Sequence, residues 1–196
     1  MHRVICLALL AALPAQADVP GGHFYVGFGA SVSKPLASDQ SLVWNPPYPG
    51  EQGISPRTDL SLSFEIAYET THAFVAASVE RGGVLQTQPE YSLQSLRGGI
   101  IFGTESTAPY VAVGAGHLSM TVFTPYDMGT MVDASGAAVL AEAGVLLLRD
   151  RQIGRIALGL RLIEPLFGMH PPSWLPGIAS TSDRIPLLLF TTRLFL

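Results

Sequence analysis

Apolar and polar residues alternate along much of the chain. The clearest stretch runs from Thr58 to Thr70. Its apolar residues fall at every second position: Leu60, Leu62, Phe64, Ile66 and Tyr68. Successive side chains of a β-strand point to opposite faces, so this period of two predicts a strand with one apolar and one polar face.

The same alternation recurs in seven further segments. They cover residues 23–33, 73–80, 96–103, 111–122, 139–147, 156–162 and 186–196. In the segment 111–122 the phase changes, so that Leu118, Met120 and Val122 become the apolar set, and a β-bulge near Gly114 or Gly116 would produce that change. The sequence therefore predicts eight strands.

The segments between these strands are alternately short and long. The connections near 70–72, 103–108 and 149–152 are short, whereas those near 34–57, 82–90, 123–136 and 164–184 are longer. An antiparallel meander places the short connections at one end and the long ones at the other, as in transmembrane barrels. The mature sequence contains no apolar run of the length that a membrane helix needs. The predicted fold is an all-β, eight-stranded, antiparallel, up-and-down transmembrane β-barrel.

Two glycine-rich aromatic strands carry a resemblance to a known class. They read YVGFG at 25–29 and PYVAVGAG at 109–116. With the strand pattern, they make residues 20–196 resemble the small eight-stranded outer-membrane proteins of Gram-negative bacteria, of the OmpA transmembrane domain, OmpX and OmpW type. The resemblance implies a place in the outer membrane with both termini in the periplasm. It also implies contact with outer-membrane lipid or lipopolysaccharide and with the outer-membrane assembly machinery.

The first residues have the pattern of a secretory signal peptide. A basic start at Arg3 precedes an apolar run over 4–12, and Ala15 and Ala17 form a small-x-small cleavage site. The predicted organisation is a signal peptide at 1–17 followed by an outer-membrane barrel domain at 18–196. Cys6 is the only cysteine, so removal of the signal peptide leaves no thiol for a disulfide or a metal site.

Composition separates the membrane barrel from a soluble one. Hydrophobic residues make up 48% of the chain and charged residues only 13%, with a net charge of −4. Lys34 is the only lysine, so no basic patch for nucleic acid is expected. The soluble alternative is a lipocalin-like barrel, in which the apolar faces point into a ligand cavity. So few charges would cover its outer surface poorly, which favours the membrane barrel.

Charged residues on the polar faces of six strands would lie in the lumen. These residues are Glu65, Glu80, Arg97, Glu142, Arg161 and Arg193. Buried charges are tolerated when they are paired, so we expect a charge network in which Glu80 pairs with Arg97 and Glu142 with Arg161. An eight-stranded barrel is only wide enough for its own side chains, which favours a filled scaffold over a narrow ion or proton path.

One pair of residues suggests catalysis. His117 and Ser119 share a strand face and resemble the His-x-Ser element of the outer-membrane lipid A deacylases. That family has Asn after its serine, where this chain has Met120, and the nearest carboxylate to the expected acid position is Asp133. The interpretation is that no catalytic centre is evident, with a lipid A deacylase-like hydrolase as the alternative. The other histidines lack metal-ligand spacing, and no cofactor motif occurs.

The long connections are candidates for contact with an external ligand. Trp44 and Tyr48 in the first, and Trp174 in the last, lie in proline-rich sequence. Aromatic residues near the short-turn end suggest an interfacial girdle: Phe24, Tyr68, Phe102 and Tyr110. The expected role is therefore structural or surface-binding. A further alternative is a narrow passage for small apolar compounds, as the resemblance to OmpW-like proteins implies.

Overall fold

The fold is formed by eight β-strands. The computed structural model describes residues 22–36, 59–83, 90–123, 131–150, 154–168 and 184–196. The strands are β1 (Gly22–Pro35), β2 (Asp59–Thr70), β3 (Ala73–Gly82), β4 (Glu90–Ile101), β5 (Ala108–Phe123), β6 (Met131–Leu147), β7 (Arg155–Pro165) and β8 (Leu187–Phe195). No helix with the length and apolar character of a membrane span occurs among these residues.

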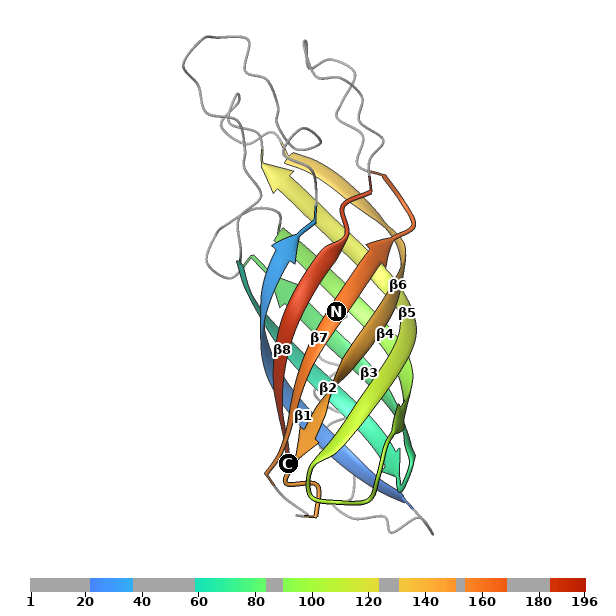
Figure 1. The fold of residues 1–196 in the computed structure, drawn as a ribbon. Coiled ribbons are helices and arrows are strands. Elements are labelled where there is room, and N and C mark those ends of the chain that lie inside the picture. Colours follow the sequence, from blue (N-terminus) through green and yellow to red (C-terminus); the bar gives the residue numbers. More distant parts are fainter. Residues whose placement is uncertain (1–21, 37–58, 84–89, 124–130, 151–153, 169–183) are drawn as a thin grey trace, which may run out of the picture.

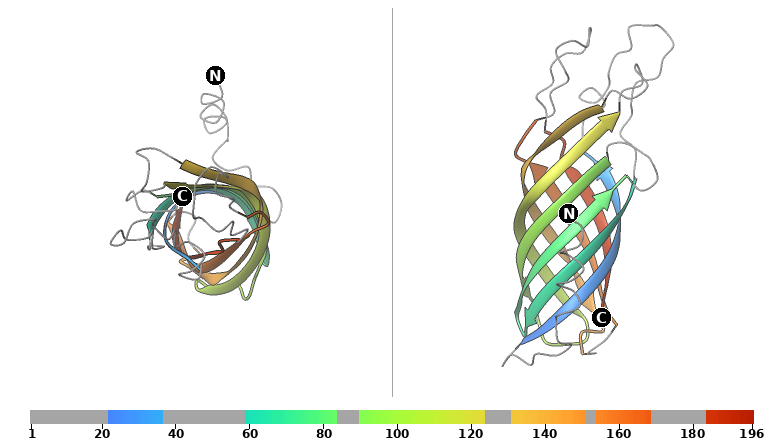
Figure 2. Two further views of the ribbon diagram at one scale, coloured as in Figure 1. Left: turned by 90° about the horizontal axis from the view of Figure 1, so that it is seen from above. Right: turned by 180° about the vertical axis from the view of Figure 1, so that it is seen from behind.

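The strands close into one barrel in sequence order. Each strand pairs antiparallel with the next, and β8 returns to pair with β1, where Gly29 lies opposite Arg193. Figure 1 shows the tilted strands in side view, and Figure 2 shows the ring from above. The predicted eight-stranded, up-and-down antiparallel barrel is confirmed. We call the end with the three short connections the turn end and the opposite end the loop end.

The outer face of the barrel is apolar over its middle. The side chains of Val113 and Leu96 are 70% and 60% exposed, and exposed large apolar residues come from all eight strands. The predicted alternating sets of β2, β7 and β8 point outward as expected, with Leu62, Leu160 and Phe190 exposed. A lipocalin-like barrel would turn these side chains into its cavity, so their outward direction contradicts that alternative.

Strand β6 extends further toward the loop end than the sequence pattern predicts. It begins at Met131, within the connection predicted near 123–136, whereas β4 begins at Glu90, at the end of the connection predicted near 82–90. The predicted bulge near Gly114 or Gly116 is wrong, because β5 pairs with both neighbours in unbroken register through these positions. Leu118 and Met120 consequently lie inside the barrel, with 0% and 1% of their surface exposed.

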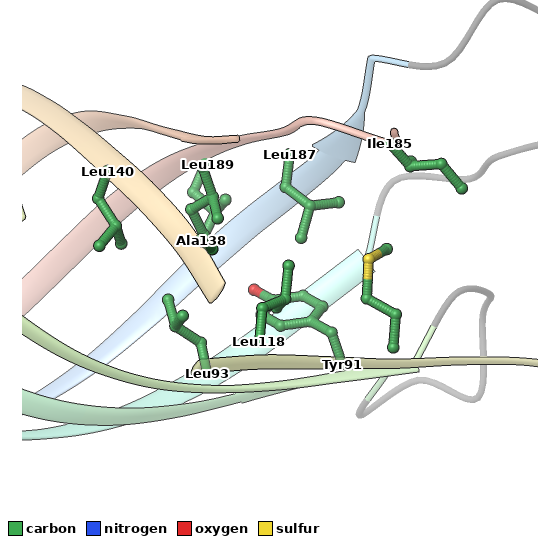
Figure 3. Packing of buried hydrophobic residues seen from close by; sticks show 10 residues of the cluster. Tyr91, Leu93, Leu118, Ala138, Leu140, Ile185, Leu187 and Leu189 are labelled. Carbon is green, nitrogen blue, oxygen red and sulfur yellow. The ribbon is translucent and has the colours of Figure 1, made fainter. Parts of the chain in front are cut away.

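The apparent change of phase in β5 has a physical cause, which is that the inner and outer faces of the strand exchange polarity. Toward the loop end, the outward positions of β4 and β5 become polar, with Gln94 and His117 exposed. The inward positions become apolar and form a cluster that fills this part of the lumen (Figure 3). Its members are Tyr91, Leu93, Leu118, Met120, Ala138, Leu140, Ile163, Ile185, Leu187 and Leu189. The strand keeps its register while its two faces exchange polarity.

A second apolar cluster lies in the lumen toward the turn end. Its members are Tyr25, Ala67, Ala76, Ile101, Ala108, Tyr110, Leu146, Ala157 and Phe195, with Phe74 packed against it. The rings of Phe74 and Tyr110 pack edge to face, with centroids 5.7 Å apart. The two apolar clusters therefore enclose the middle of the lumen, where the charged residues lie.

Candidate functional site: the charged lumen

The charged residues of the lumen come from six different strands. Glu65, Glu80, Arg97, Glu142, Arg161 and Arg193 are each at most 5% exposed. Glycines provide the room that the long arginine side chains need: a Cβ atom at Gly29 would lie 2.7 Å from Cγ of Arg193. An inward-facing glycine on the neighbouring strand thus allows the extended arginine side chain to lie across a narrow lumen.

Glu142 accepts contacts from three arginines. Its Oε2 lies 2.7 Å from Nη1 of Arg97 and 2.7 Å from Nε of Arg161. Nη2 of Arg193 donates to Oε1, and so does the hydroxyl of Tyr110. A carboxylate can accept several charge-assisted hydrogen bonds, and these are stronger than neutral ones in a poorly hydrated interior. Glu142 is therefore the central residue of the network.

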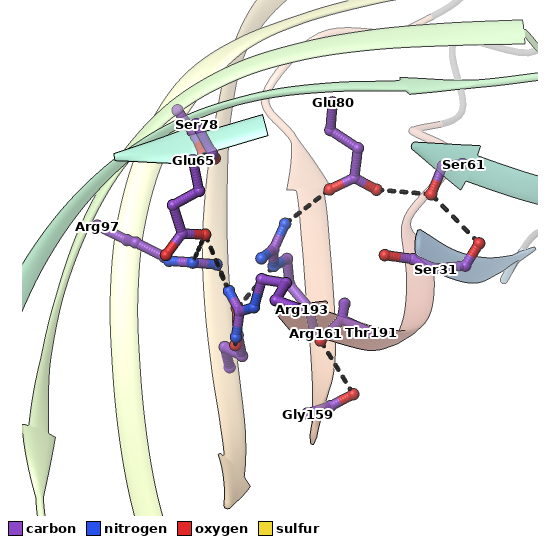
Figure 4. A network of polar contacts seen from close by, with 12 residues as sticks. Ser31, Ser61, Glu65, Ser78, Glu80, Arg97, Gly159, Arg161, Thr191 and Arg193 are labelled. Atoms are coloured by element: carbon purple, nitrogen blue, oxygen red, sulfur yellow. Dashed lines mark hydrogen bonds and ion pairs between the residues drawn. The ribbon is translucent and has the colours of Figure 1, made fainter. Parts of the chain in front are cut away.

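The other two glutamates extend the network in opposite directions. Glu80 accepts hydrogen bonds from Nη1 of Arg161 at 2.7 Å and from the hydroxyls of Tyr91 and Ser61 at 2.8 and 2.9 Å. Glu65 pairs with Arg97 and lies 3.2 Å from Nη1 of Arg193. Figure 4 shows both branches. Three acids and three bases give the network no net formal charge, which limits the cost of burying it.

The structure forms one of the two ion pairs expected from the sequence. Arg161 and Glu142 lie opposite each other on adjacent strands and pair. The Glu80–Arg97 pair is wrong: Glu80 lies opposite Leu93 and Arg97 opposite Ala76, so the two side chains leave β3 and β4 at different levels. Each instead reaches across the lumen to a partner on a more distant strand.

A small cavity lies beside the network on the turn side. It has a volume of about 20 Å³ and is lined by residues that include Glu65, Arg97, Tyr110 and Arg193. The Nε atoms of Arg97 and Arg193 are buried and find no hydrogen-bond acceptor among the described residues. A space of this size can hold a single water molecule, which could accept from such a donor.

At the turn end, the short connections are linked by an arginine that the sequence pattern did not identify. Arg149, in the β6–β7 connection, is 8% exposed and donates to Glu69 at 2.8 Å and to the carbonyls of Gly103 at 2.8 Å and Thr71. It thus links all three short connections. The preceding residue, Leu148, has a φ of 58°, a left-handed conformation that non-glycine residues rarely adopt. Arg149 was missed because alternation describes strands, and this residue lies in a turn.

Two other groups predicted from the sequence, the catalytic pair and the aromatic girdle, lie mostly on the outer face of the barrel. His117 and Ser119 lie on the outer face of β5 near the loop end, and the carboxylate of Asp133 accepts a hydrogen bond from Thr121 at 2.7 Å. In the proposed aromatic girdle, Phe24 and Phe102 are exposed, but Tyr110 is 1% exposed and belongs to the lumen network. Trp44, Tyr48 and Trp174 lie outside the described residues.

The charge network joins strands across the lumen. Within the described ranges, no group of three or more His, Cys, Asp or Glu side chains is placed to hold a metal ion. The arginines and glutamates of the network form ion pairs with one another, and apolar clusters lie on both sides of them. Chemically, the network can hold six strands together across the lumen.

Comparisons with known proteins identify the fold. The sequence matches no protein-family model and no curated protein. The structure is similar to that of Neisserial surface protein A, with a TM-score of 0.59 and 13% identity over 90% of this chain and 98% of that one. It is also similar to the N-terminal β-barrel domain of Pseudomonas aeruginosa OprF, with a TM-score of 0.54 and 13% identity over 89% and 99%. The chain therefore has the fold of the small eight-stranded barrels that its sequence resembles.

Proposed function

We propose that this protein is a closed outer-membrane β-barrel with a structural or surface-binding role. The observation that carries the proposal is the outward apolar surface, to which every strand contributes exposed large side chains. Soluble monomers rarely expose apolar patches of more than a few hundred Å². Lipid, in contrast, requires such a surface on a barrel that crosses it.

The height of the apolar surface supports a membrane span. On β1 it runs from Phe24 to Val32, both exposed. These eight residue steps cover about 26 Å along the strand at roughly 3.3 Å per residue. A tilt of roughly 40° reduces this to about 20 Å, close to the apolar band of about 25 Å that is typical of outer-membrane barrels. In bacterial barrels the short turns lie on the periplasmic side, so we place both termini in the periplasm.

The filled lumen supports a scaffold in preference to a pore. Leu93, Leu118 and Leu189 are buried at its loop end, and the paired charges occupy its middle. A passage for ions or small apolar compounds would have to displace these side chains. A binding role would instead use the long connections that hold Trp44, Tyr48 and Trp174 in the sequence.

Electrical recording in planar bilayers tests the closed barrel. The purified protein should give a flat current trace at applied voltages of either sign, because paired charges and apolar side chains fill the lumen. Insertion is verified on the same sample by gel mobility in SDS, since a folded barrel migrates differently before and after boiling. A large porin is the positive control for the bilayer. Stepwise conductance from the inserted protein would contradict the filled lumen.

A further inference from the structure

Two hollows follow one another along the outer face of β3, β4 and β5. The first is an apolar groove of about 490 Å³ in the middle of the barrel, lined by residues that include Phe64, Ala77, Leu96 and Ala115. The second is a polar notch of about 160 Å³ nearer the loop end. Its lining residues are Arg81, Glu90, Tyr91, Ser92, Ser119 and Thr121.

The strand register joins the two hollows into one feature. Ala77, Leu96 and Ala115 form one row across β3, β4 and β5. Two residues further toward the loop end, Val79 lies opposite Gln94 and Gln94 opposite His117. The next outward row contains Arg81, Ser92 and Ser119. The outer surface thus changes from apolar to polar within two rows, each roughly 7 Å from the last along the strand.

The shape and chemistry of this feature fit one class of occupant. A flexible acyl chain can lie in the groove, where Ala77 and Ala115 end at Cβ and leave space between larger neighbours. In the notch, the Arg81 guanidinium suits a phosphate, and the hydroxyls and the Glu90 carboxylate suit sugar hydroxyls. We propose that this face binds one acylated, phosphorylated sugar lipid of the lipid A type, a proposal that rests on the membrane location proposed above.

A second copy of the barrel fits the same feature less well. The outer wall of a barrel is convex and would touch the rim of a groove while leaving its base unfilled. A partner barrel would also have to bury Arg81 and Glu90, which are exposed and half-exposed here. Burial of such charges without specific partners is costly. A lipid instead brings its own polar group to the level of the notch.

Lipid binding is tested with the full-length protein extracted from membranes in mild detergent. Purified lipid A is added, and native mass spectrometry measures the bound fraction. Arg81→Gln removes the cation of the notch, and Ala77→Phe fills the groove. Each should weaken lipid A binding about tenfold, the effect of losing one charge-assisted hydrogen bond or a comparable apolar contact. The matched controls are Lys34→Gln, another exposed cation, and Ala143→Phe on the outer face of β6, and both should bind as wild type does.

Each other result has a defined meaning. Equal binding of lipid A by all variants, or equal binding of lipid A and phosphatidylcholine by the wild type, would overturn the site and indicate an unspecific lipid annulus. A dimer that Ala77→Phe disrupts would assign the groove to a second copy instead. In all these cases the wild type still comes from the membrane fraction and shifts on boiling. Absence from that fraction would overturn the membrane location together with this site.

Discussion

Replacement of Glu142 by glutamine should lower the free energy of unfolding by about 3–5 kcal/mol, the usual cost of breaking a buried ion pair from one side. Glu142 accepts from Arg97, Arg161 and Arg193 within a lumen closed by apolar side chains. Without its charge, three guanidinium groups would share two carboxylates. The measurement is urea-induced unfolding of the barrel in phospholipid vesicles, followed by tryptophan fluorescence.

Two further variants make this experiment specific. Glu105→Gln changes an exposed carboxylate in the β4–β5 turn and should stay within about 0.5 kcal/mol of wild type. The double variant Glu142→Gln with Arg97→Met should recover part of the loss, because it leaves Arg161 with Glu80 and Arg193 with Glu65. A single Glu142→Gln variant as stable as wild type would show that water, and not Glu142, compensates the arginines.

Val113→Arg should destabilise the barrel by about 2–4 kcal/mol, as charges do at the lipid-facing midplane of barrels. Val113 is 70% exposed in the apolar part of the outer face. His117→Arg, four residues further along the same strand and the same face, should cost only about 0–1 kcal/mol, because that position lies beyond the apolar surface. The same unfolding experiment in vesicles measures both. Equal, small effects at the two positions would mean that the outer surface of β5 meets water.

Most of the fold could be predicted from alternation alone. A strand of a barrel with an apolar outer surface and a packed lumen alternates between two kinds of side chain, and on β2 Leu60, Leu62 and Phe64 form the apolar face. The inward charges could also be identified, since a charge such as Glu65 or Arg161 within an alternating apolar strand has to be on its opposite face. Strand number, order and the two types of connection follow from these local patterns.

The polarity of the loop end could not be predicted in the same way. Alternation shows that two sets of residues face opposite ways, but it does not show which set faces inward. Leu118 and Met120 are apolar because they fill the lumen, whereas Val111 and Val113 are apolar because they face outward. Toward the loop end, the two faces of β5 exchange polarity without a bulge. In the sequence, such an exchange of polarity has the same pattern as a shift in the phase of alternation caused by a bulge.

Which residues of the charge network pair with one another could not be predicted from the sequence either. An arginine side chain is long enough to contact residues on several strands. Its ion-pair partner therefore depends on the strand register and on the curvature of the closed barrel. Glu80 and Arg97 belong to adjacent strands, yet Glu80 meets Arg161 of β7 across the lumen. Tyr110 joins the network for the same reason, although its position near the short-turn end suggested an interfacial residue. Contacts across the lumen require the closed structure.

Fluorescence quenching in bilayers tests most directly which face of a strand points to lipid and which points into the lumen. Trp44 and Trp174 are replaced by phenylalanine, and a single tryptophan is introduced as Val111→Trp or Tyr110→Trp. These neighbouring residues lie at nearly the same depth on opposite faces of β5, with Val111 exposed and Tyr110 buried. Lipids with brominated acyl chains should strongly quench the tryptophan at 111 and leave the one at 110 bright. Quenching at 110 and not at 111, or at neither position, would contradict a barrel that turns its apolar face to lipid.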